Sequence, residues 1–334
     1  MSAARTVRHD AARPVLPGGT PVHRSVRRVR RREMATAAAL MGPWIAGVGL
    51  FVVYPLAATV YFSFTHYNML DRPRFVGLHN WAFVLGHYPP FWTSLRNTLW
   101  LVAVMVTLRV IAGFGLAMLV VRVRIGGRLM RTALFVPYLV PPVAAALGFV
   151  YLLRPGDGPV NRLLGAVGIG GPGWFDDPAW SKAALTLLAL WGVGDVMVVF
   201  LAALADVPKA RVEAALMDGA TGWQRFRHIT LPEMSPTLLF AAITGVIAAL
   251  QYYTQAMVAS QAASGDLAAP GLTAEPGFPE QSTLTLTQTL YSLGFIHADT
   301  GAASVVAVIL FGLSIGLTAL LLRRRSGFAA GVLR

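Results

Sequence analysis

The chain has 334 residues, of which 55% are hydrophobic and only 13% are charged, and its formal net charge is +13 at pH 7. A charged fraction of about 25% is usual for a soluble domain, so this composition and its positive mean hydropathy indicate a polytopic membrane protein. Cysteine is absent, which excludes disulfides, thiolate metal sites and cysteine nucleophiles.

Residues 1–33 are basic, contain nine arginines and show no apolar periodicity, so we expect a disordered cytoplasmic tail. The run HRSVRRVRRR at 23–32 could bind nucleic acid, but no aromatic residue is interleaved with its arginines. Retention at the anionic inner leaflet is therefore the favoured interpretation. The apolar run that follows is too long for a signal-peptide core of about 7–15 residues and is expected to remain as an anchor.

Six apolar segments are long enough to cross a bilayer, which takes about 20 helical residues. They are Ala35–Phe64, Asn97–Val121, Thr132–Leu153, Ala183–Ala205, Pro236–Ser260 and Gly301–Leu322. The sequence thus predicts an all-α membrane protein with six transmembrane helices over 34–325 and a cytoplasmic end at 326–334. The segment Ser282–Phe295 is too polar to span and is expected at the outer surface.

The distribution of lysine and arginine predicts the orientation of these spans. One set of connecting segments, which includes both termini, carries 21 of these residues, whereas the opposite loops carry six. Because cytoplasmic loops are enriched in basic residues, both termini should be cytoplasmic. The basic charge is therefore mainly a topology signal.

Two spans contain an ionisable residue, Arg109 in the second and Asp195 in the fourth. Each costs about 2.5–3.5 kcal/mol at the bilayer centre on insertion scales, so each should have a partner or face water. Either the two residues pair with each other, or they line a translocation path. The third span contains VPYLVPP (136–142), whose prolines predict a kink that is either structural or a hinge.

The fifth span contains QYYTQ, which places two amides and two tyrosines in an otherwise apolar segment. Amide hydrogen bonds and aromatic faces suit sugar hydroxyls and rings, but the same groups also serve contacts between helices. The candidate substrate contacts from this stretch are Gln251, Tyr252, Tyr253 and Gln255.

A cytoplasmic stretch, EAALMDGATGWQRFRHITLP at 213–232, interrupts the apolar segments. Its composition predicts a short helix, a sharp turn at Gly219 and a second amphipathic helix, which Pro232 closes while it opens the next span. The aromatic side chains of Trp223 and Phe226 could anchor in a partner's groove. An amphipathic helix that touches only lipid headgroups is the alternative.

The spacing in this stretch is E-A-A, three residues, G, nine residues, I-x-L-P, and it resembles the cytoplasmic signature loop of ABC importer permeases. SLRNTL (94–99), GDGPVNRLL (156–164), WFDDPAW (174–180) and FLAALADVP (200–208) resemble the six-span sugar permeases of the maltose and glycerol-3-phosphate type, which have a MetI-like fold. The chain departs from that pattern in its longer loop at 261–282 and in TGAAS at 300–304. Both departures leave the substrate open.

The resemblance implies that the coupling loop, residues 206–232, docks in a cleft of a separate cytoplasmic ABC ATPase dimer. The positions that match the motif are Glu213, Ala214, Ala215, Gly219, Ile229, Leu231 and Pro232, and the amphipathic pattern adds Trp223 and Phe226 to the candidate contacts. The resemblance further implies a second related permease subunit, an extracytoplasmic binding protein that delivers a sugar, and a place in the bacterial cytoplasmic membrane.

Catalytic motifs are missing from the sequence. There is no G-x-x-x-x-G-K-[ST] loop, and neither Lys182 nor Lys209 follows a glycine, so ATP and Mg²⁺ should be bound by the partner ATPase. H-E-x-x-H is also absent, and no catalytic residue, metal ligand or cofactor is predicted in this chain. The sequence indicates a transport subunit rather than an enzyme. An ion-coupled secondary carrier or a non-transporting scaffold or sensor remains the alternative.

Overall fold

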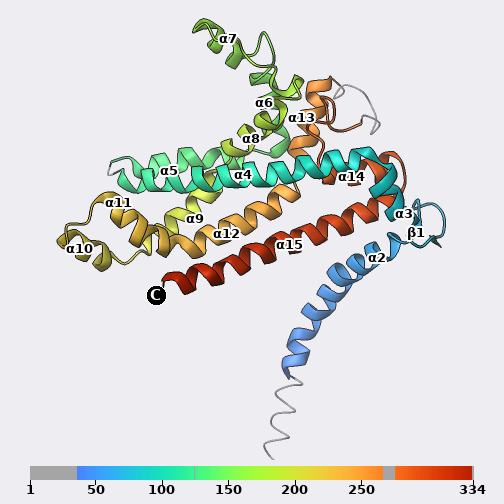
Figure 1. Ribbon diagram of the computed structural model, residues 1–334, viewed down its shortest axis with the longest axis horizontal. Coiled ribbons are helices and arrows are strands. Elements are labelled where there is room, and N and C mark those ends of the chain that lie inside the picture. The colour runs from blue at the N-terminus through green and yellow to red at the C-terminus, as the bar shows by residue number, and fades with distance from the viewer. Residues whose placement is uncertain (1–35, 124, 266–274, 333–334) are drawn as a thin grey trace, which may run out of the picture. The chain divides into compact units, whose positions relative to one another are not determined.

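The computed structural model describes residues 36–123, 125–265 and 275–332, with side chains as far as Arg323 in the last helix (Figure 1). The basic tail predicted at 1–33 lies outside these residues. The chain divides into two units, Met1–Ala57 and Ala58–Arg334. The described part of the first unit is helical, and this helix runs from Thr36 to Phe62 through the π-turn η1 (Gly49–Val53) and α2 (Tyr54–Phe62).

Among its described residues, the regular structure of the second unit is helical apart from one short hairpin, in which β1 (Thr65–His66) pairs antiparallel with β2 (Arg74–Phe75). Its first half contains α3 (His79–Ala82), η2 (Phe83–His87), α4 (Pro89–Arg122), α5 (Gly127–Phe135), η3 (Val136–Leu139), α6 (Pro142–Leu152), α7 (Pro159–Ala166), η4 (Trp174–Asp176) and α8 (Ser181–Trp191). Its second half contains α9 (Gly194–Ala205), α10 (Lys209–Met217), α11 (Gly222–Arg225), η5 (Phe226–Thr230), α12 (Leu231–Leu250), α13 (Thr254–Ser264), α14 (Leu286–Tyr291), η7 (Ser292–Ile296) and α15 (Thr300–Val332).

Among the described residues, four helices are long and apolar enough to cross a membrane: Thr36–Phe62, Pro89–Arg122, Gly222–Leu250 and Thr300–Arg323. Two bent helix pairs satisfy the same test when each is counted as one span, which would make six. One pair joins Gly127–Leu139 to Pro142–Leu152 at 96°, and the other joins α8 to α9 at 48°. The predicted kink in the third span is therefore a sharp break.

One sequence prediction was wrong in its local detail. The fifth segment is not one helix from Pro236 to Ser260, because α12 ends at Leu250 and α13 begins at Thr254. The polar segment Ser282–Phe295 is not among the candidate spans, in agreement with its polarity. Within it Thr283, Thr285 and Gln288 are buried, and α14 contacts both α4 and α15, so its hydroxyl groups form internal hydrogen bonds.

The core of the second unit forms where α12 contacts α4, α9 and α15 (Figure 1). Phe114, Met197 and Phe200 are buried together between α4 and α9, and the rings of Phe114 and Phe200 lie 5.3 Å apart. α13 packs against α6 beside this bundle. This packing brings the helix breaks, which are described in the next section, close to one another.

Candidate functional site

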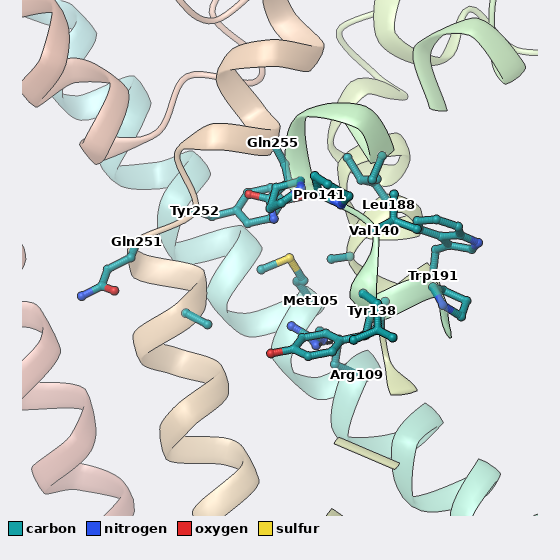
Figure 2. A pocket seen from close by; sticks show the side chains of 17 residues that line it. Met105, Arg109, Tyr138, Val140, Pro141, Leu188, Trp191, Gln251, Tyr252 and Gln255 are labelled. Carbon is teal, nitrogen blue, oxygen red and sulfur yellow. Dashed lines mark hydrogen bonds between the residues drawn. The ribbon is translucent and has the colours of Figure 1, made fainter. Parts of the chain in front are cut away.

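Three interrupted helices meet at one cavity of about 620 Å³. The break between η3 and α6 occurs at Val140 and Pro141, where proline removes a backbone donor. The break between α8 and α9 includes Gly192, and the break between α12 and α13 includes Tyr252. All of these residues line the cavity (Figure 2). Broken backbone at membrane depth is tolerated where it is buried in protein or lines a cavity, so the cavity is the candidate substrate site.

An ion pair lies at the wall of this cavity. Nη2 of Arg109, on α4, donates to Oδ1 of Asp195 at 2.7 Å, and the two side chains are 19% and 32% exposed. The same nitrogen lies 3.5 Å from the carbonyl oxygen of Gly192. Asp195 is in the first turn of α9, where the helix dipole also favours a negative charge. The two charges predicted to need partners are thus brought together, and Arg109 also lines the cavity.

The QYYTQ residues separate into different environments. Tyr252 is buried, lines the cavity and donates from its hydroxyl to the Leu185 carbonyl oxygen at 3.4 Å. Gln255 and Gln251 also line the cavity, but the amide of Gln251 points away from the other lining side chains in Figure 2. Tyr253 is not among the lining residues, and its ring lies 5.5 Å from that of Tyr291.

Two aromatic residues of the cavity were missed by the sequence analysis. Tyr138 and Trp191 both line it, from η3 and from the end of α8 (Figure 2). Each is adjacent to a helix breaker: Tyr138 follows Pro137 and Trp191 precedes Gly192. An aromatic residue next to a breaker in a predicted span is the signal that could have identified them.

The segment 213–232 forms two helices with a turn between them. Glu213, Ala214 and Ala215 lie in α10, and Gly219 adopts φ +74°, a left-handed conformation that favours glycine. Thr221 and Gln224 form a capping box that starts α11. Pro232 lies at the start of α12, so it opens the next span as predicted. It does not close the preceding helix, which continues through η5 and α12 without a break.

Large apolar side chains are exposed on these two helices. Met217 is 89% exposed and Trp223 is 66% exposed, whereas Phe226 is half-buried with its ring 6.1 Å from that of Phe114. Arg211 and Glu233 form an ion pair that joins α10 to α12. A cavity of about 520 Å³ lies beside α10, and Glu213 and Thr230 are among the residues that line it.

The remaining predicted contacts lie on the same helices: Ile229 in η5 and Leu231 at the start of α12 are each at least partly exposed. No group of three or more histidine, aspartate or glutamate side chains lies close enough to hold a metal ion anywhere in the described ranges. The described residues offer hydrogen bonding and aromatic contact in the cavity and one ion pair at its wall. They also present an exposed apolar surface on α10 and α11.

Comparison with known proteins identifies relatives along most of the chain. This chain is 31% identical over 290 residues to the sulfoquinovosyl glycerol transport system permease protein of Agrobacterium fabrum, and the alignment covers 86% of this chain and 89% of the relative. It is 32% identical over 261 residues to the lactose transport system permease protein of Rhizobium radiobacter, covering 76% and 82%.

The fold is also that of a solved transporter. One chain of a bacterial ABC transporter involved in the import of alginate matches with a TM-score of 0.72 and 19% identity, covering 90% of this chain and 98% of that one. The family model described as the binding-protein-dependent transport system inner membrane component matches residues 109–327. The protein therefore belongs to this family of membrane-spanning ABC transporter permeases, which are transport subunits with a helical MetI-like fold.

Proposed function

We propose that this permease subunit forms half of the pore of an ATP-driven importer for a sugar or oligosaccharide. The observation that carries the proposal is the cavity at which three broken helices meet, since such breaks mark substrate sites in transporters. Tyr138, Trp191 and Tyr252 supply aromatic surface there, and Gln255 supplies an amide. The names of the relatives, which include a lactose and a sulfoquinovosyl glycerol permease, support a sugar as the cargo.

In the proposed topology each bent helix pair is one span, so the chain crosses the membrane six times within 34–325. The excess of basic residues on one set of segments, 21 against six, supports cytoplasmic positions for the tail 1–33, the coupling loop 206–232 and the end 326–334. The protein is then a multi-pass protein of the bacterial cytoplasmic membrane. Its cargo arrives from an extracytoplasmic binding protein, and a second permease subunit completes the pore.

Energy enters through residues 213–232. A separate ATPase dimer binds ATP and Mg²⁺. It also binds α10 and α11 of this chain, where Met217 and Trp223 are the most exposed large apolar side chains. The ion pair of Arg211 with Glu233 and the unbroken helix from Gly222 to Leu250 connect this surface to the cavity. Movement of the ATPase is thereby passed to the end of α12, where Gln251 and Tyr252 begin the break.

The test is co-purification of the ATPase with tagged permease in mild detergent. Met217→Glu places a charge in the proposed interface, and Leu163→Glu in α7 is the matched control, since Leu163 is 71% exposed but lies outside it. Both variants should fold, because neither side chain is buried. We expect the ATPase to be lost from the Met217→Glu variant and to co-purify with the Leu163→Glu variant. Equal recovery of ATPase by both variants would refute the proposed docking surface.

A further inference from the structure

The charge of the cargo is left open by the family. The relatives include one named for sulfoquinovosyl glycerol, a sulfonated and therefore anionic sugar, and one named for lactose, which is uncharged. If the cavity is the sugar path, as proposed above, its own electrostatics must favour one class. The inference below rests on that proposed function and specifies its substrate.

The cavity has no free charge to offer a substrate in the part of the chain that the structure describes. Arg109 is the one charged residue among those that line it. Its guanidinium is already bonded to Asp195 at 2.7 Å, so the pair adds no net charge to the wall. An anionic group that approached Arg109 would also approach the Asp195 carboxylate, whose repulsion would oppose the attraction of the guanidinium.

The other polar groups at the cavity suit hydroxyls rather than acids. Gln255 presents an amide that can donate and accept, and Tyr138 presents a hydroxyl with the same capacity. Trp191 and Tyr252 add aromatic faces (Figure 2). Aromatic rings pack against the apolar faces of a sugar, and groups that both donate and accept match its hydroxyls. The volume of about 620 Å³ lies within the range of about 300–1,000 Å³ for small-molecule sites.

We propose that the cavity selects uncharged sugars, and that Asp195 enforces this choice by neutralising Arg109. Asp195 is then a specificity residue that acts through Arg109 rather than by touching the sugar. Removal of its charge would expose an unpaired cation at the wall and convert the cavity into one that accepts acidic sugars. A purely structural role for the ion pair predicts no such change in preference.

The experiment measures sugar binding to the assembled permease–ATPase complex in nanodiscs by saturation-transfer NMR, without binding protein. Lactose is the uncharged probe and digalacturonate is the acidic probe. Wild type should bind lactose in preference to digalacturonate. Asp195→Asn should raise the ratio of digalacturonate to lactose binding about tenfold or more. Gln255→Lys, which adds a cation without disturbing the ion pair, should shift the ratio in the same direction.

Asp157→Asn is the matched control, because Asp157 is exposed and lies in the loop between α6 and α7, away from the cavity. It should leave the ratio at the wild-type value. Recovery of the ATPase with each variant checks that the complex has folded. A wild type that binds digalacturonate as well as lactose, or a ratio unchanged in Asp195→Asn, overturns the inference while the proposed sugar transport stands. Binding of neither sugar to wild type refutes the proposed function, and the inference with it.

Discussion

The break between α8 and α9 depends on a close approach that only glycine permits, and Gly194→Ala tests it. A Cβ built at Gly194 would lie 2.8 Å from the Cα of Phe135, and it would lie closer still to the carbonyl oxygen of Leu134. Ordinary van der Waals contact begins at 3.4 Å, so the backbone at the end of α5 would have to withdraw by about 0.6 Å or more. Backbone atoms cannot swing aside as a flexible side chain can.

The cost follows from this overlap. Overpacking a well-packed interior costs about 1–3 kcal/mol. Replacing glycine by alanine in a helix interior returns up to about 1 kcal/mol, and less at the first residue of α9. The net loss in the free energy of unfolding should therefore be about 1–2 kcal/mol. For a chain of 334 residues, that corresponds to a fall of about 1–3 °C in the unfolding midpoint.

Gly192→Ala is the matched control, two residues away. A Cβ there meets nothing nearer than the Ala189 carbonyl oxygen at 4.0 Å, and the backbone, at φ −88°, accepts alanine. This variant should be neutral or stabilised by up to about 1 kcal/mol. Both variants are compared with wild type by thermal unfolding in detergent, followed by tryptophan fluorescence. Equal midpoints for the two variants would refute the packing of α9 against the end of α5.

The ion pair predicts strong coupling between its members: Asp195→Ala alone should destabilise the protein by about 2–3 kcal/mol because Arg109 is left unpaired, and Arg109→Leu in addition should recover much of that loss. Additive losses in a double-mutant cycle of detergent unfolding would contradict this. Asn97→Ala should cost about 2–4 kcal/mol, because this buried amide donates to two backbone carbonyl oxygens at 2.8 and 3.0 Å and accepts from Lys182 at 3.1 Å. Asn68→Ala is its control, since Asn68 is only partly buried, and a midpoint shift as large in this variant would show that burial is not the cause.

The features predictable from sequence were those that depend on a single segment. Apolar length alone predicted where the first, second and last long helices lie, to within a few residues at most ends. The turn at Gly219 was predictable because it needs only a residue that accepts positive φ. The prolines of 136–142 indicated a kink because proline disrupts the helix in which it lies. The angle of 96°, however, depends on how α6 packs against α13.

The break in the fifth span could not be predicted, because distant residues stabilise it. The carbonyl oxygen of Tyr252, released from helical bonding, accepts from the hydroxyls of Thr285 and Thr287 at 3.3 and 3.4 Å. Those hydroxyls belong to the segment Ser282–Phe295, which the sequence analysis judged too polar to span. One tertiary contact therefore accounts for the error in the fifth span: the hydroxyls of the buried Thr285 and the partly buried Thr287 satisfy the backbone of the break, and the break survives because these threonines are there.

Arg109 and Asp195 are charged residues in the bilayer-spanning part of the chain, and their position at the cavity offers a reason for their presence. The sequence offered two roles for Arg109 and Asp195, a structural pair or a lined path, and the geometry makes these roles compatible, because the pair lies at the cavity wall. An aliphatic pair would have cost less to insert. A neutralised cation retains one property that aliphatic residues lack, which is a positive charge held next to the cavity and cancelled by one carboxylate. If the cavity is the sugar path, the net charge of its wall, and hence the class of sugar it accepts, can change through the single residue Asp195.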